Sequence, residues 1–152
     1  MNSRIEFFRN QIGKDKWQFD YPLMDWLNAR VIEVNEGYVK MSFTVEKYML
    51  NPIGIMHGGI MATILDEVMG AASFTLGRPN GYSTINMNID YLNPAKAGDT
   101  VIAEGHVVRA GKTILHLKAK IYSADNTSVD NKGKLLAKAT SNMIGTSVQI
   151  PI

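Results

Sequence analysis

Apolar and polar side chains alternate along most of the chain, as they do in half-buried β-strands. Val39, Met41 and Phe43, for example, alternate with polar residues. The pattern predicts two strands within residues 28–48, around a turn at 35–37. It predicts four more strands further on, separated by segments rich in Gly, Pro, Asn and Asp: 82–92, 100–109, 113–123 and 134–145. The last three follow one another closely, which is typical of an antiparallel meander.

Residues 57–76 break this alternation, because apolar side chains surround most of the segment. We predict one long central helix here, ended by Gly77 and Pro79. A short helix is also expected at residues 3–10. The order β-β-α-β-β-β-β favours an α+β fold in which a strongly curved antiparallel sheet wraps around the long helix. Such a sheet leaves edge strands and an outer face, which dimerisation commonly protects.

Length and composition fit one ordinary soluble domain. The 152 residues predict a single domain over 1–152, with a short helical extension over about 1–20. The net charge of +2 is too small and dispersed for a nucleic-acid partner. No stretch reaches the ~18 apolar residues of a membrane span, so we expect no membrane partner. The chain contains no cysteine, which fits a reducing compartment, and we expect a cytoplasmic protein.

Two motifs resemble functional sites but have simpler explanations. The segment from Gly105 to Gly111 resembles a phosphate-binding loop, yet the residues after it alternate like a strand, whereas a phosphate-binding loop must open a helix. A hairpin turn is the better interpretation. His106 and His116 lie on adjacent predicted strands, but two imidazoles without cysteine or clustered carboxylates make a poor metal site. We interpret them as surface histidines and expect no metal.

The segment "NPIGIMHGGIMATILDEVMG", residues 51–70, brings four kinds of reactive group within sixteen residues. They are the amide of Asn51, the imidazole of His57, the glycines Gly58 and Gly59, and the carboxylate of Asp66. Each has a structural explanation: a turn, a helix cap, close packing and a satisfied hydrogen bond. An ionised carboxylate in the apolar part of a helix nevertheless costs stability unless it is paired or used.

Taken together, these groups indicate thioester chemistry. A helix start offers unpaired N–H groups and partial positive charge, and glycine lets a carbonyl approach the backbone closely. The two features make an oxyanion site. We expect Ile64, Leu65, Val68 and Met69 to shield Asp66 from water and strengthen it as a base or nucleophile. A thiol such as that of pantetheine departs without a strong acid, because its pKa is about 8.5.

The spacing along the helix requires a second copy of the chain. Gly58 and Asp66 are eight residues apart, which is about 12 Å at ~1.5 Å per residue, too far for both to reach one carbonyl. If two helices pack antiparallel about a two-fold axis, the start of one lies beside the middle of the other. We therefore expect a homo-oligomer in which a dimer is needed to complete each site.

In these residues and their spacing, the sequence resembles the hotdog-fold acyl-CoA thioesterases of the phenylacetate-degradation (PaaI) type, within the 4-hydroxybenzoyl-CoA thioesterase superfamily. The resemblance covers roughly residues 35–145 and rests on the Asn, the His-Gly-Gly helix start and the helical Asp. It implies the same curved sheet around one central helix. It also implies an acyl-CoA substrate, no metal or redox cofactor, since coenzyme A belongs to the substrate, and a homotetramer.

The resemblance also implies a role for each matching residue. Gly58 would polarise the thioester carbonyl through its backbone N–H, while His57 and Asn51 would position the thioester or the attacking water. Asp66, from the opposite subunit, would be the nucleophile or general base. Thr84, in the segment "STINMNIDYLNPAKAGD" after the helix, would assist the water.

Further residues follow from the same resemblance. Because some related branches use glutamate as the helical carboxylate, Glu67 is an alternative to Asp66, but the spacing from His57 favours Asp66. Gly59 and three basic residues are candidate substrate-binding groups, the basic ones for the phosphates of coenzyme A: Arg78, Arg109 and Lys112. Solvated surface charge is their simpler explanation.

The function we predict is hydrolysis of an aryl- or fatty-acyl-CoA. One alternative is a hotdog enoyl-CoA hydratase or dehydratase, which needs an acid and a base at one carbon centre. The other is a non-catalytic acyl-CoA-binding protein that retains the groove. The acyl group is not fixed by the sequence, although several apolar side chains are candidates for lining the groove: Met24, Trp26, Met49, Met61 and Met87.

Overall fold

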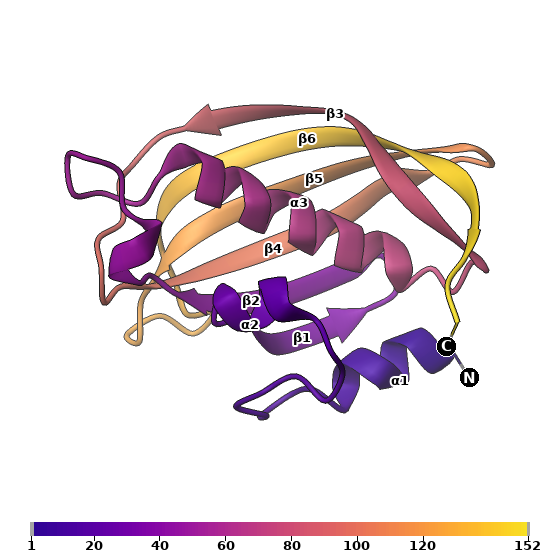
Figure 1. The fold of residues 1–152 in the computed structure, drawn as a ribbon, viewed down its shortest axis with the longest axis horizontal. Coiled ribbons are helices and arrows are strands. Elements are labelled where there is room, and N and C mark those ends of the chain that lie inside the picture. Colours follow the sequence, from indigo (N-terminus) through magenta and orange to yellow (C-terminus); the bar gives the residue numbers. More distant parts are fainter. Residues whose placement is uncertain (1, 152) are drawn as a thin grey trace.

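Six antiparallel strands wrap around one long helix in the computed structural model, which describes residues 2–151 (Figure 1). The strands are β1 Arg30–Asn35, β2 Tyr38–Thr44, β3 Asn80–Tyr91, β4 Thr100–Ala110, β5 Ile114–Ala124 and β6 Lys132–Gln149. The helices are α1 Ser3–Arg9, α2 Pro22–Trp26, the 3-10 turn η1 Lys47–Met49 and the long α3 Gly58–Phe74. Within residues 2–151, no helix is both long and apolar enough to cross a membrane.

The strand order in the sheet is β1-β2-β4-β5-β6-β3. It confirms the predicted α+β hotdog architecture, with β4, β5 and β6 as the antiparallel meander and α3 held in the curve of the sheet (Figure 1). The predicted elements end within a few residues of the observed ones. The sequence pattern did not predict α2 or η1, because they have only five and three residues, too few to show a helical period.

Helix α3 packs closely on β4 because Gly105 has no side chain. The inner face of α3 places Ile64, Leu65 and Val68 in the core, with no measurable exposure. A Cβ atom at Gly105 would lie 2.1 Å from the carbonyl oxygen of Val68, so any other residue would push the helix away from the sheet. This glycine therefore serves packing, and the segment that resembled a phosphate-binding loop is the end of β4 and its hairpin turn, as predicted.

The two strand histidines do not meet. His106 stands opposite Lys118 and His116 opposite Arg109. His106 packs against Tyr38, with ring centroids 4.7 Å apart, and burial lowers the pKa of His106. Among residues 2–151, no group of three or more His, Cys, Asp or Glu side chains is placed to hold a metal ion.

The sheet ends in two different edges. At one edge, β1 is accompanied by the N-terminal segment, residues 3–26, which carries α1 and α2 (Figure 1). At the other edge, β3 pairs only with β6 among residues 2–151. Large apolar side chains are exposed on and just after β3, including Ile85 at 50% and Tyr91 at 52% of their surface. Strand β3 is therefore an unprotected edge of the kind that a second chain can cover.

Candidate active site

The start of α3 presents one free backbone donor. His57 is the N-cap residue, and its Nδ1 atom accepts a hydrogen bond of 2.8 Å from the Gly59 N–H. Among residues 2–151, the Gly58 N–H has no hydrogen-bond acceptor. Because Nδ1 is the acceptor, the proton of neutral His57 is on Nε2, which remains a donor. Of the two glycine amides, Gly58 is thus the one available to a substrate carbonyl.

Asn51 organises the loop that leads into the helix. Its Oδ1 atom accepts hydrogen bonds from the backbone N–H groups of Ile53, at 3.1 Å, and Ile55, at 3.3 Å. Within the described residues, the side-chain NH₂ group of Asn51 has no acceptor. Asn51 therefore stabilises the turn, as expected from its structural explanation, and its NH₂ group is still available as a donor. Its predicted contact with substrate stays a prediction.

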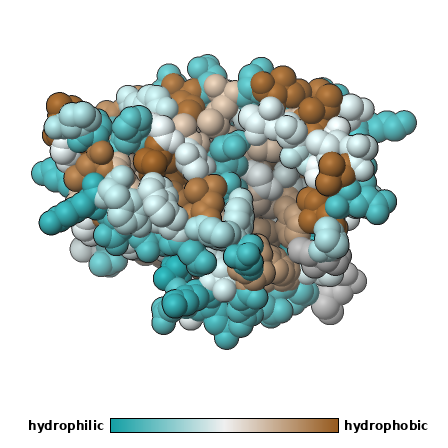
Figure 2. Space-filling model, viewed as in Figure 1, coloured by the Kyte–Doolittle hydropathy of each residue, from teal (hydrophilic) through white to brown (hydrophobic). Residues whose placement is uncertain are grey.

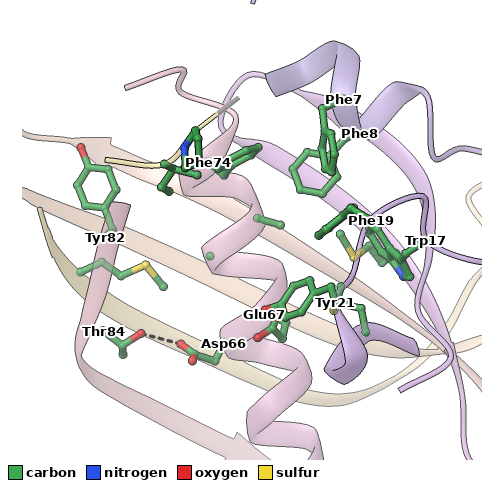
Figure 3. A pocket seen from close by; sticks show the side chains of 17 residues that line it. Phe7, Phe8, Trp17, Phe19, Tyr21, Asp66, Glu67, Phe74, Tyr82 and Thr84 are labelled. Atoms are coloured by element: carbon green, nitrogen blue, oxygen red, sulfur yellow. Dashed lines mark hydrogen bonds between the residues drawn. The ribbon is translucent and has the colours of Figure 1, made fainter. Parts of the chain in front are cut away.

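Asp66 and Thr84 form a hydrogen-bonded pair in the middle of α3. The Thr84 hydroxyl donates to Asp66 Oδ1 over 2.8 Å, from β3 to the helix (Figure 3). The register of β3 against β6 shifts just after Thr84, an irregularity that can re-aim a side chain. Two residues that are 18 positions apart in the sequence, both predicted as site residues, are thus brought together within one chain.

The prediction that four apolar neighbours shield Asp66 from water was partly wrong. Ile64, Leu65, Val68 and Met69 are fully buried, but they pack on the core side of α3, whereas Asp66 is half-buried on another face. Ile64, Leu65 and Val68 are only one or two positions from Asp66, and residues at that spacing on a helix point in different directions. Met69, three positions away, is itself fully buried in the core. Within a single chain, Asp66 is accessible rather than dry.

Glu67 has a different environment from Asp66. The Tyr21 hydroxyl donates to Glu67 Oε2 over 2.6 Å, linking α3 to the N-terminal segment. Burial raises the pKa of Glu67 and the nearby Asp66 charge adds to this, while the Tyr21 hydrogen bond opposes it. Burial and the Glu67 contact also raise the pKa of Tyr21. Glu67 is therefore held by a structural partner, and Asp66 by a hydroxyl that can also hold water.

Both carboxylates open into one cavity of about 600 Å³. Figure 2 shows this face of the molecule hollowed, with pale and brown residues in the hollow. The cavity has Asp66, Glu67 and Thr84 at one end and is otherwise mostly apolar (Figure 3). A largely apolar cavity of this size with a few convergent polar groups is typical of a small-molecule site.

The sequence did not predict most of the cavity wall. Of the five apolar residues expected to line a groove, only Met24 lines this cavity. Met49 and Met61 are buried in the core, and Trp26 packs against Tyr48. The aromatic part of the wall comes largely from the N-terminal segment, which holds five of the 13 aromatic residues of the chain between positions 7 and 21. This concentration of aromatic residues in the sequence could have indicated the wall of a binding site. The five aromatic residues of this segment that line the cavity are Phe7, Phe8, Trp17, Phe19 and Tyr21.

The three basic candidates lie near the β4–β5 turn and differ from one another. The Arg78 guanidinium donates to the Tyr82 hydroxyl and the Gly111 carbonyl, each at 2.7 Å, and to the Ala110 carbonyl at 3.1 Å. It holds the turn in place, so fewer of its N–H groups are left for a phosphate. Arg109 and Lys112 are exposed. Phosphate binding by any of the three stays a prediction.

The site residues of one chain form two separate half-sites. Gly58 and Asp66 lie on the same regular helix, so their backbones are about 12 Å apart along its axis. One half-site offers the Gly58 N–H, His57 and Asn51. The other offers Asp66 and Thr84 at one end of the cavity. The first can polarise a carbonyl and the second can activate water or attack directly, but not on the same atom within one chain.

Comparison with known proteins is consistent with this chemistry. The model of the thioesterase superfamily matches residues 53–129. The human protein named acyl-coenzyme A thioesterase 13 is 34% identical over 112 residues, which cover 71% of this chain and 73% of that protein. Acyl-coenzyme A thioesterase PaaI of Escherichia coli is 28% identical over 122 residues, which cover 80% and 82%.

Solved structures show the same fold. The E. coli PaaI protein from the phenylacetic acid degradation operon matches with a TM-score of 0.75 at 23% identity, covering 87% of this chain and 89% of that one. The smu.793 protein of Streptococcus mutans, solved with acetyl CoA bound, matches with a TM-score of 0.72 at 23% identity, covering 90% and 100%.

Proposed function

The chain belongs to the thioesterase superfamily, and from this premise we propose that it is an acyl-CoA thioesterase, which hydrolyses an aryl- or fatty-acyl-CoA to the free acid and coenzyme A. The observation that carries the proposal is the Thr84–Asp66 hydrogen bond at one end of the apolar cavity. It puts an activating carboxylate next to a space that fits an acyl group.

Asp66 activates the attack on the thioester carbonyl. As a general base, it takes a proton from a water molecule held by Thr84, and the hydroxide forms the new C–O bond. As a nucleophile, its carboxylate forms an anhydride with the acyl group, and water then cleaves this intermediate. In both cases the C–S bond breaks and the coenzyme A thiolate leaves, later taking up the proton. A thiolate needs no metal to leave, so the reaction requires no cofactor.

The Gly58 N–H of a second chain stabilises the oxyanion. The free amide at the start of α3 points its partial positive charge at the carbonyl oxygen, and His57 and Asn51 orient the thioester beside it. Since Gly58 and Asp66 of one chain serve different sites, each active site requires two chains. The exposed apolar edge at β3 supports such pairing. We propose a cytoplasmic homotetramer built from these dimers, with Arg109 and Lys112 near the coenzyme A phosphates.

A substrate panel tests the activity. Aryl- and fatty-acyl-CoAs are offered to the wild type and to Asp66→Ala, and release of free thiol is followed. We expect hydrolysis by the wild type, with a loss of at least about 100-fold in Asp66→Ala. Equal rates would contradict the mechanism. Loss of the enoyl absorbance of crotonyl-CoA without thiol release would indicate a hydratase, and tight binding without release a binding protein.

A mixing experiment tests the shared site. Gly58→Pro removes the amide N–H at the first helical position, where proline is well tolerated, and His57 already has the extended conformation that precedes proline (ψ 135°). Gly58→Ala is the matched control, because it keeps the N–H and its Cβ would make ordinary contact with Tyr91 at 3.4 Å. We expect Gly58→Pro alone to lose about 100-fold or more in kcat.

Mixed dimers of Gly58→Pro and Asp66→Ala then contain one intact site each. Random exchange makes half of the dimers mixed, so we expect about a quarter of the wild-type rate from two inactive proteins. Subunit exchange is checked by mass spectrometry on differently tagged chains. If mixed dimers form without recovery of activity, Gly58 and Asp66 do not act across the interface.

A further inference from the structure

One face of α3 forms the floor of the cavity and has its smallest side chains in the middle. Asp66, Gly70 and Phe74 follow one another at four-residue intervals, so they lie in a row along the helix, and all three line the cavity. A Cβ atom at Gly70 would meet no atom within 4 Å. The open space above Gly70 therefore connects the carboxylate end of the cavity with its aromatic end.

The aromatic end is closed by rings from the N-terminal segment. Phe74, two helical turns beyond Asp66, packs edge-on against Phe7 and Phe8, with ring centroids 6.1 and 5.7 Å apart. Phe7 also packs against Phe19, at 4.8 Å between centroids. In Figure 3 these rings lie together at the end of the cavity opposite Asp66 and Thr84. Aromatic pairs in such edge-to-face arrangements stabilise the wall beyond the apolar area they bury.

The N-terminal segment is fastened at the other end of the cavity as well. The hydrogen bond from Tyr21 to Glu67 holds it one residue from Asp66. Trp17 donates its indole N–H to the Ala29 carbonyl over 3.1 Å, which fixes the middle of the segment beside β1. The segment is thus attached along the whole length of the cavity, and its shape sets the space available.

The length of the floor limits what can lie on it. From Asp66 to Phe74 the helix rises about 12 Å. An extended hydrocarbon chain advances roughly 1.25 Å for each carbon–carbon bond of ~1.5 Å, so about ten carbons span this distance. A longer chain would meet the rings of Phe7 and Phe74.

We propose that the N-terminal segment and Gly70 determine acyl specificity: the acyl group lies along α3 from Asp66 to Phe74, and groups of up to about ten carbons in length are accepted. This rests on the proposed thioesterase function, because continuity with Asp66 and Thr84 identifies the acyl group as the occupant. Gly70 sets the width at the midpoint, and Phe7 closes the end.

The test measures binding and hydrolysis separately across chain length. Binding is measured by calorimetry with non-hydrolysable S-alkyl-CoA thioethers of 2–16 carbons, and hydrolysis by thiol release from the matching acyl-CoAs. Four proteins are compared: wild type, Gly70→Leu, Gly70→Ala and Phe7→Ala. For the wild type we expect affinity to rise about fourfold per methylene and to stop rising near ten carbons.

The variants should move the chain length at which affinity stops rising, the chain-length limit, in opposite directions. In Gly70→Leu the side chain fills the midpoint, so the limit falls to about five carbons, since Gly70 is halfway along the ~12 Å floor. Gly70→Ala, the matched control, adds one methyl group in open space and should move the limit by about one carbon or less. Phe7→Ala should raise the limit above ten carbons.

The outcomes separate the two proposals. An identical limit in all four proteins overturns the specificity proposal and leaves the thioesterase function standing if thiol is released. Shifted binding limits without thiol release uphold the acyl site and overturn the thioesterase function. Neither binding nor hydrolysis of any length overturns both.

Discussion

Asp66 and Glu67 are neighbours in the sequence, yet the fold places them in different environments. Asp66 receives a hydrogen bond from Thr84, on the edge strand β3, in a half-buried position open to the cavity. Glu67 is about 100° further around the helix and receives one from Tyr21 of the N-terminal segment. Burial raises the pKa of Glu67.

The difference assigns distinct tasks to two similar groups. Thr84 has a small hydroxyl that can hold a water molecule against Asp66, whereas one carboxylate oxygen of Glu67 accepts from the bulky Tyr21 side chain. The carboxylate whose partner can also hold water is suited to chemistry, and the one bonded to Tyr21 is suited to fastening the cavity wall. Substitutions of the two carboxylates and of their hydrogen-bond partners test this difference. The expected effects decrease from one substitution to the next.

The largest effect is expected when each carboxylate is changed to its own amide. Asp66→Asn should lower kcat by about 1,000-fold, because the amide can neither accept the proton of water nor attack the thioester. Glu67→Gln keeps an oxygen that accepts from Tyr21, so we expect a loss below about tenfold. Both are measured as thiol release at saturating substrate. A larger loss in Glu67→Gln than in Asp66→Asn would reverse the two assignments.

A smaller effect is expected from the partner of Asp66. Thr84→Val removes the hydroxyl at nearly constant shape, and loss of a hydrogen bond to a charged group corresponds to about 1.5–3 kcal/mol, or roughly 10- to 100-fold in kcat/KM. Thr84→Ser is the matched control and should stay within a few-fold of the wild type. If the serine and valine variants are equally impaired, packing rather than the hydroxyl explains the role of Thr84.

The smallest effect is on stability, and its size depends on pH. The folded protein raises the pKa of Glu67 above its ordinary value of 4.5, so the fold favours the protonated acid. The associated stabilisation is present below the ordinary pKa and is lost as the pH rises through the folded one. Glu67→Gln does not titrate, so its Tm should exceed that of the wild type by a few degrees near pH 7.

This advantage should shrink toward pH 4, and thermal unfolding across pH 4–8 measures it. Tyr21→Phe is the companion variant. It removes the hydrogen bond that favours the Glu67 carboxylate, so its destabilisation should be greater at pH 7 than at pH 4. A pH-independent Tm difference in both variants would show that Glu67 does not titrate differently in the fold.

The sequence predicted the fold well for reasons that are local. Alternation in β2 and the strands of the meander, the apolar run of α3, and the turn residues between them each follow from short-range periodicity. The motif "NPIGIMHGG" also indicated a helix start with an open amide, since a cap and a first turn are local structures. Asp66 was predicted from its position in an apolar helix and Thr84 from a family resemblance, and the structure brings the two together.

The cavity could not be predicted in the same way. Phe7 and Phe74 are 67 positions apart, and Tyr21 and Glu67 are 46 positions apart. Nothing in the periodicity of either segment specifies that they meet. The expectation that Ile64 and Val68 would enclose Asp66 failed because sequence neighbours on a helix face different directions.

The sequence by itself thus determined the elements, their order and the reactive groups, because these depend on residues within a few positions of one another. Only the tertiary structure decided which partner each carboxylate has and which aromatic side chains surround the cavity. These outcomes depend on contacts between distant segments, whose geometry is set by how the whole sheet curves around α3 and where the N-terminal segment comes to rest upon it.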